Sequence, residues 1–152
     1  MRGPKLVRAE LSVHVHATED ENKVVQAVRN IVSSEDILKA SREVKEVLEG
    51  HYSNPITRIR LEVPGENAEK LLSRILKALD EHDKRVLVET LDRRYDEKGG
   101  RLYIRLSKQD AYLGEVRLMD GDDVIRIMFV FRGAPSISDI RRFLEELQGL
   151  MI

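Results

Sequence analysis

The chain has 152 residues, of which 41% are hydrophobic and 35% are Asp, Glu, Lys or Arg, and its formal net charge is −1. This length suits one domain with a single buried core, covering residues 1–152, and the near-neutral charge excludes a nonspecific polycation but not a local basic patch. Because the chain has no cysteine, disulfides, thiolate zinc sites and cysteine nucleophiles are excluded.

The first third of the chain predicts a strand and then a helix. Residues 6–17 alternate between apolar and polar side chains, a period of two that is typical of a half-buried strand. Thr18 is the predicted N-cap of a helix that runs to about Ser33, because the acidic residues 19–21 suit the positive end of a helix dipole. This helix buries Val24, Val28 and Ile31.

The segment 34–49 fits a helix and a strand equally well. Ile37, Ala40 and Val44 have helical spacing, whereas Val44, Glu46 and Leu48 alternate as in a strand. Residues 50–55 are rich in turn formers and predict a loop. Alternation returns at 57–63, which predicts a second strand.

The middle of the chain predicts two helices. Residues 66–80 form an amphipathic pattern on Leu71, Leu72 and Ile75, and residues 83–95 bury Leu87 and Leu91 in the same way. Glycines at 99 and 100 end this unit.

The last third predicts strands followed by a helix. Residues 101–107 alternate strictly, residues 108–114 form a short polar break, and residues 115–119 resume the alternation, so a hairpin-like element is expected. Residues 120–122 predict a turn into a strand at 123–132. Ser136 is the predicted N-cap of a final helix.

The predicted order of elements indicates an α+β fold. Each strand has one apolar and one polar side, so we expect a two-layer sandwich in which a mostly antiparallel sheet carries its helices on one face. The polar strand residues then share the other face. They are Arg8, Glu10, Ser12, His14, His16, Arg58, Arg60, Glu62, Arg101, Tyr103, Arg105, Glu115, Arg117, Arg126 and Arg132.

Arginine dominates this polar face, whereas most acidic residues fall in helix turns and loops. Guanidinium groups pair with phosphates and stack on bases, and a tyrosine adds a stacking surface, so the pattern favours an RNA-binding platform. Two other interpretations stay open. Glu10, Glu62 and Glu115 could pair with arginines across strands on a merely solvated face, or the face could be a subunit interface.

Other polar groups give weaker signals. His14 and His16 have a spacing that zinc sites use, but the spacing identifies no third ligand, and the acids at 120–123 fit a turn better than a calcium site. No nucleophile elbow or phosphate-binding loop is present. We therefore expect no catalytic activity, no metal and no cofactor.

Three segments resemble an archaeal family described as a predicted exosome subunit or RNA-binding protein. They read HATED (16–20), GHYSNP (50–55) and LYIRLSKQDAYLGE (102–115), and the resemblance covers nearly the whole chain. Ser53 departs from the family, which commonly carries glycine there. The resemblance implies a fold similar to the ribosomal protein that binds 5S rRNA. It also implies a shared site at the positions His16, His51, Asn54, Lys108, Gln109 and Tyr112.

Pattern and resemblance together predict a non-catalytic protein that binds structured RNA, such as rRNA or a tRNA-like molecule. Its partners would be exosome or ribosome-assembly proteins; the alternative is a protein-interaction or homodimerisation module that uses the same face. The N-terminus lacks an apolar signal core and no apolar run approaches the ~20 residues of a membrane span, so we expect no membrane association and a cytoplasmic location. The predicted RNA contacts are Arg58, Arg60, Arg101, Tyr103, Arg105, Lys108, Gln109, Tyr112, Arg117, Arg126, His14, His16, His51 and Asn54.

Overall fold

A computed structural model describes residues 3–49 and 54–148. Its described part has one six-stranded sheet in the order β2-β3-β1-β6-β5-β4, and every neighbouring pair is antiparallel. The strands are β1 (Leu6–Val15), β2 (Arg42–Glu49), β3 (Pro55–Pro64), β4 (Tyr95–Asp96), β5 (Arg101–Leu106) and β6 (Ile125–Phe131). The helices are α1 (Glu21–Val32), α2 (Glu35–Ala40), α3 (Gly65–Ala78), α4 (Glu81–Glu89), α5 (Leu91–Arg94), α6 (Lys108–Tyr112) and α7 (Ile137–Leu147).

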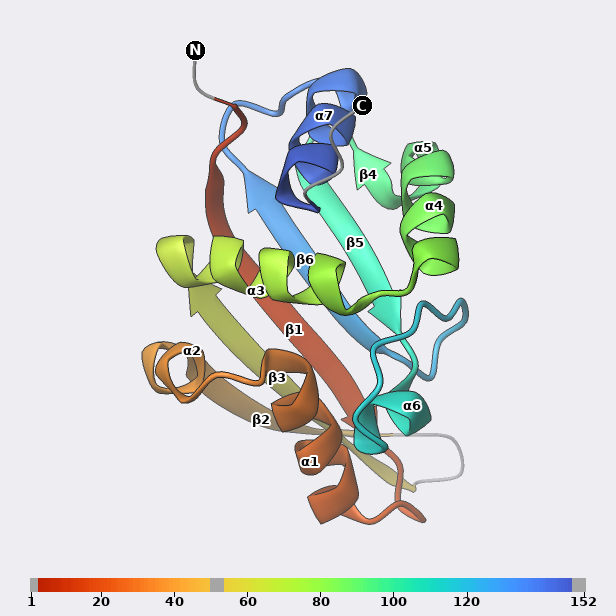
Figure 1. Cartoon of the computed structure of the whole chain (residues 1–152). Helices are drawn as coiled ribbons and strands as arrows, with labels where there is room; N and C mark the ends of the chain where they lie inside the picture. Colours follow the sequence, from red (N-terminus) through yellow and green to blue (C-terminus); the bar gives the residue numbers. More distant parts are fainter. Residues whose placement is uncertain (1–2, 50–53, 149–152) are drawn as a thin grey trace.

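The helices lie against one face of the sheet, with α3 across its middle, α1 and α2 towards one end and α7 towards the other (Figure 1). This arrangement confirms the predicted α+β two-layer sandwich. Within the described residues, no helix combines the length and the apolar character needed to traverse a bilayer.

The core fills the space between the sheet and the helices. Leu11 on β1, Ile104 on β5 and Phe129 on β6 are fully buried, as are Leu72 and Ile75 on α3. Each such side chain contributes about 1.5–3 kcal/mol by leaving water. Because strand side chains alternate between faces, burial of these residues leaves the polar ones on the opposite, open face.

The ambiguous segment 34–49 contains both of the predicted structures in succession. The short helix α2 is capped by Ser34, whose side chain accepts from the backbone N–H of Ile37, and β2 begins at Arg42. The two patterns overlapped because a six-residue helix leaves room for only two turns before the strand begins.

Several predicted boundaries were wrong. Asp20, and not Thr18, caps α1, because the Asp20 carboxylate accepts from the N–H of Asn22. The expected helix over 83–95 is divided into α4, α5 and the short strand β4, and the last strand runs over 125–131 instead of 123–132. Ser136 does cap the final helix.

The hairpin-like element expected after β5 is present only in part. The polar break at 108–114 contains the helix α6, and residues 115–119 form only an isolated bridge between Leu106 and Leu118. The strands that pair with β5 are β6 along its length and β4 over two residues. The N–H of Ser107 donates to the carbonyl of Arg117 at 2.9 Å and the N–H of Met119 to the carbonyl of Arg105 at 3.1 Å, so residues 117–119 return antiparallel along the end of β5 without forming a regular strand.

In the β4–β5 connection, Gly100 is the glycine at which an added Cβ would make the closest contact. It has φ +65, and a Cβ there would lie 2.8 Å from the backbone oxygen of Phe131. We predict that Gly100→Ala lowers the free energy of unfolding by about 2–4 kcal/mol, since left-handed strain and a backbone clash add together. Denaturant unfolding measures the loss. Gly133→Ala is the matched control, because Gly133 also has positive φ but meets nothing within 4 Å; an equal loss in both variants would contradict the clash.

Candidate nucleic-acid interface

The open face of the sheet carries its polar side chains in rows across the strands. One row runs from Val44 on β2 through Arg60, Ser12 and Arg126 to Arg105 on β5, because these residues are successive cross-strand partners. The strand registers thus bring together arginines that are far apart in the sequence. The arginines towards the two ends of this row differ in whether neighbouring carboxylates pair with them.

On the β2–β3–β1 half, carboxylates neutralise the arginines. The Arg60 guanidinium donates to Glu10 at 2.8 Å and to Glu46 at 2.9 Å, and lies 3.4 Å from Glu62. Arg58 donates to both oxygens of Glu46, at 3.0 and 3.1 Å. The hydrogen bonds from Arg60 and then Arg58 lower the pKa of Glu46. This half therefore fits the interpretation in which cross-strand Glu–Arg pairs keep the face soluble.

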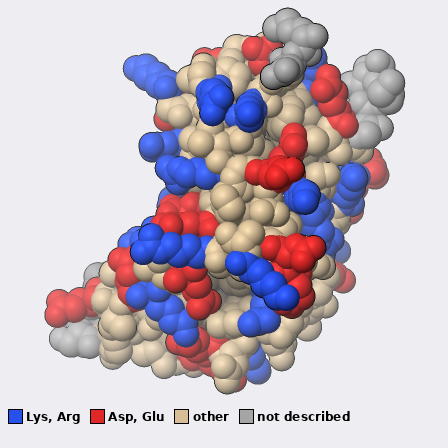
Figure 2. Space-filling model, turned by 90° about the vertical axis from the view of Figure 1, so that its left-hand side faces the viewer, with Lys and Arg blue, Asp and Glu red and all other residues tan. Residues whose placement is uncertain are grey.

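The flank of the molecule next to β2 and β3 shows the same mixture of charges. Basic and acidic side chains are interspersed over it (Figure 2). Arginine therefore does not dominate the open face of this half, because Glu46 joins Glu10 and Glu62 among its arginines; the expected pairing of Glu10 and Glu62 with an arginine is present.

On the β6–β5 half, the arginines lack such partners. Arg105 and Arg126 are direct cross-strand neighbours. In the part of the chain that the structure describes, the arginines that form ion pairs are Arg42, Arg58, Arg60, Arg94 and Arg117. Like charges placed directly opposite each other destabilise a sheet. A bound anion would remove that repulsion.

A hollow of about 370 Å³ lies beside this pair of arginines. Its lining includes Arg58, Arg105 and Arg126 from three strands, with Ser12 and His14 from β1, and Asp122 at its side. The Nε atom of Arg58 is buried and has no hydrogen-bond partner in the described structure. The hollow thus offers an anion the guanidinium groups of Arg105 and Arg126 and the hydroxyl of Ser12, beside Arg58, which already donates to Glu46. This donor set suits a phosphate.

His14 is a partly buried imidazole that lines this hollow. Burial, followed by the charge of Arg58, lowers the pKa of His14 from its ordinary value of 6.5. The imidazole is therefore mainly neutral at pH 7 and can donate or accept a hydrogen bond.

Tyr103 lies next to the same arginines. Its ring faces the guanidinium of Arg126 at 5.5 Å from the ring centroid, a cation–π arrangement. Arg101 occupies the far end of β5, opposite Val130, and is exposed. Together these residues form the basic half-face, which we define as Arg101, Tyr103, Arg105 and Arg126 with Arg58.

Lys108, predicted as an RNA contact, is instead a buried internal cation. Its Nζ donates to the carbonyl of His14 at 2.9 Å, to Glu19 at 3.0 and 3.1 Å and to Asp123 at 2.6 Å. These bonds tie α6 to the end of β1, to the start of α1 and to the loop before β6. An ammonium held in this way is not available to a phosphate.

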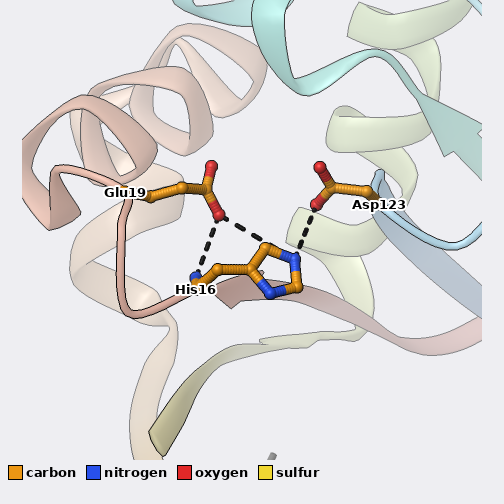
Figure 3. A group of neighbouring side chains, drawn as sticks. All are labelled: His16, Glu19 and Asp123. Carbon is orange, nitrogen blue, oxygen red and sulfur yellow. Dashed lines mark hydrogen bonds and ion pairs between the residues drawn. The ribbon is translucent and has the colours of Figure 1, made fainter. Parts of the chain in front are cut away.

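His16 joins the same cluster. Its Nε2 lies 3.3 Å from Asp123, and its backbone N–H donates to Glu19 at 2.9 Å (Figure 3). Burial alone would raise the pKa of Asp123, but the hydrogen bond and charge of Lys108, aided by His16, hold it below its ordinary value. His14 points to the open-face hollow and not to this cluster, so the two imidazoles serve different sites.

The ligand atoms of His16, Glu19 and Asp123 lie within 4.8 Å of one another, as metal ligands would. The ammonium of Lys108 already bonds both carboxylates. A divalent cation would have to approach against that fixed positive charge, so this cluster is better described as an ion-pair network than as a metal site.

The other predicted contacts are dispersed. Gln109 and Tyr112 lie on α6 and line a separate hollow with Lys108. Arg117 lies outside the named strands, beside the end of β5, and pairs with Glu115 at 3.2 Å. Asn54 is exposed just before β3, and His51 lies outside the described residues.

Sequence patterns missed Glu46, whose segment was ambiguous, and gave no signal for the contact between Lys108 and Glu19.

Comparison with known proteins decides the family. A family model described as RNA binding matches residues 8–131. The chain belongs to this RNA-binding family. The chain is 38% identical over 124 residues to an uncharacterized protein of Methanocaldococcus jannaschii. The aligned region covers 81% of this chain and 83% of that relative. The chain is also 35% identical over 138 residues to an RNA-binding protein of Pyrococcus abyssi, covering 86% and 88%.

Solved structures share the fold of this chain. A crystal structure from Archaeoglobus fulgidus, of family DUF54, matches with a TM-score of 0.78 and 30% identity over 94% of this chain and 99% of that one. Another DUF54 structure, from Sulfolobus solfataricus, gives 0.80 and 25% identity over 95% and 99%. The predicted resemblance to an archaeal RNA-binding family is thereby confirmed.

The difference in ion pairing between Arg105 and Arg60 predicts that their substitution by glutamine changes the melting temperature differently. Arg105→Gln should leave the melting temperature of the RNA-free protein unchanged or raise it, because it removes a repulsion. Arg60→Gln should lower it, because Glu10 would lose its ion-pair partner and Glu46 and Glu62 would each keep only one. Thermal unfolding at low salt compares the two variants; a loss in Arg105→Gln as large as in Arg60→Gln would show that Arg105 is structural.

The ion pairs of the buried Lys108 lead to a second prediction, on the free energy of unfolding. Lys108→Met should lower the free energy of unfolding by about 1–3 kcal/mol, since it removes the buried ammonium that bonds Glu19, Asp123 and the carbonyl of His14. Lys23→Met, a change of the same size on the neighbouring helix α1, serves as the control. Urea unfolding measures both. If the two variants lose equal stability, Lys108 does not hold the cluster together.

Proposed function

We propose that the chain binds RNA without catalysing a reaction, and that the basic half-face makes the phosphate contacts. The observation that carries this proposal is the direct opposition of Arg105 and Arg126 without a carboxylate partner, beside a hollow that Arg58 also lines. A sheet tolerates such a repulsive pair more readily when an anion bridges it.

The geometry suits contact with the RNA backbone. Guanidinium groups bind phosphate oxygens in pairs and also stack on base planes. Tyr103 extends the same surface with a ring on which a base can stack. Arg60 takes no direct part, because three carboxylates already hold it.

The biological setting is the finer part of the proposal. The named relatives come from archaea, and one is called an RNA-binding protein. Together with the resemblance to a predicted exosome subunit, this supports a cytoplasmic role in RNA processing or in ribosome assembly, acting on structured rRNA or a tRNA-like molecule. A backbone-binding sheet face fits such substrates, because double-stranded RNA is recognised mostly through shape and phosphates.

The proposal predicts a defined salt dependence. About four phosphate contacts give a slope of log K against log salt near −3 to −4. Arg105→Gln and Arg126→Gln should each weaken binding and flatten that slope by about 1. Arg85→Gln is the matched control, because Arg85 is exposed on α4. Fluorescence anisotropy with a structured and a single-stranded RNA measures the slopes.

The alternative is that the same half-face docks a protein or a second copy of the chain. In that case the wild-type chain binds no RNA even at low salt, and Arg105→Glu changes the oligomeric state in sedimentation experiments. Loss of RNA affinity in Arg105→Glu with an unchanged oligomeric state supports the RNA proposal instead.

A further inference from the structure

A second hollow lies on the other side of the loop that borders the basic half-face. It measures about 650 Å³ and opens between the start of α1, the helix α6 and the segment 113–123. This volume falls within the ~300–1,000 Å³ of pockets that hold small organic groups.

Exposed apolar side chains gather at this hollow. Tyr112, Leu113 and Met119 line it, and they are three of the five large hydrophobic side chains that are exposed in the described part of the chain. Single exposed apolar residues are ordinary, but a group of them around one depression indicates a binding site. We call this site the Tyr112 hollow.

The charges around the Tyr112 hollow do not favour phosphate. Four acids line it, Glu19, Asp20, Asp110 and Asp123, against two cations, Lys23 and Lys108. The ammonium of Lys108 already bonds Glu19 and Asp123. A ligand here should be flat and uncharged, and it should present hydrogen-bond donors to the carboxylates. Nucleobases with an exocyclic amino group have these properties, since carboxylates accept from such groups.

The wall of the Tyr112 hollow is held in place before any ligand arrives. The Asn30 side chain on α1 donates to the backbone oxygens of Ala111 at 2.9 Å and of Tyr112 at 3.2 Å. The Lys23 ammonium lies 5.7 Å from the centroid of the Tyr112 ring. These contacts fix the end of α6, so a base that stacks on Tyr112 would not have to order it.

The Tyr112 hollow also adjoins the proposed phosphate site. Asp122 and Val124 line the open-face hollow, whereas Met119 and Asp123 line the Tyr112 hollow. One loop thus forms a wall of both. An RNA strand bound by Arg105 and Arg126 would have to cross only this loop to bring a base to Tyr112.

We infer that the Tyr112 hollow receives one unstacked RNA base that carries an amino group, namely adenine, cytosine or guanine. This inference rests on the proposed function, since the half-face supplies the phosphate contacts and the Tyr112 hollow supplies base preference. Uracil, which has no amino group, should be accepted less well.

The test compares oligo(A), oligo(C) and oligo(U) decamers as ligands of the full chain in wild-type, Tyr112→Ala and Tyr112→Phe forms. Wild-type protein should prefer oligo(A) and oligo(C) over oligo(U) by about 5-fold or more, and Tyr112→Ala should lose about 10-fold in affinity for them. Tyr112→Phe should retain the preference, because the ring remains. The salt slope of Tyr112→Ala should stay at the wild-type value, since no phosphate contact is removed.

Two outcomes overturn the inference, and they are distinguishable. If wild-type protein binds the decamers but Tyr112→Ala binds them with the same affinity and base preference, the Tyr112 hollow is not used and the proposed function stands. If wild-type protein binds no RNA, and adenosine monophosphate shifts no amide resonance of residues 108–112, both the inference and the proposed function fail. Because Tyr112 is 41% exposed, Tyr112→Ala should fold, which circular dichroism checks.

Discussion

One-sided burial of the sheet is the constraint on which the rest of this structure depends. With helices on a single face, each long strand must turn its apolar residues to that face, and a slip of one residue in any register would bury arginines instead. Leu11, Ile104 and Ile127 therefore fix the strand pairings. The same pairings decide which charged residues become neighbours on the open face, so the candidate site is a consequence of how the core packs.

The two halves of the open face differ mainly in whether carboxylates pair with their arginines, and less in how many charged residues they carry. Glu46 on β2 holds both Arg58 and Arg60, whereas Arg105 and Arg126 face each other without an acid between them. A chain with net charge −1 can therefore keep a local positive field. The paired charges on the other half of the face limit how far this positive field extends. A bound polyanion should therefore adopt the orientation that places it over Arg105 and Arg126.

Sequence patterns predicted the fold where they repeat and failed where an element is short. The alternation in 101–106 and the helical spacing in 66–78 are long enough to identify a strand and a helix. The five residues of α6 carry a single buried apolar side chain, Ala111, too few for a period. The pairing of Arg58 and Arg60 with Glu46 was not predicted, because Glu46 lay in an ambiguous segment. The burial of Lys108 depends on contacts with distant residues that no local pattern encodes.

The central position of β1 has a consequence for how the chain reaches its fold. The first strand pairs on one side with β3 and on the other with β6, which lies near the opposite end of the chain. Such nonlocal pairing requires closure of a large loop and slows folding. During synthesis, β1 would leave the ribosome long before β6, so one edge of the nascent β1–β3 pair would stay open until the last strands emerge.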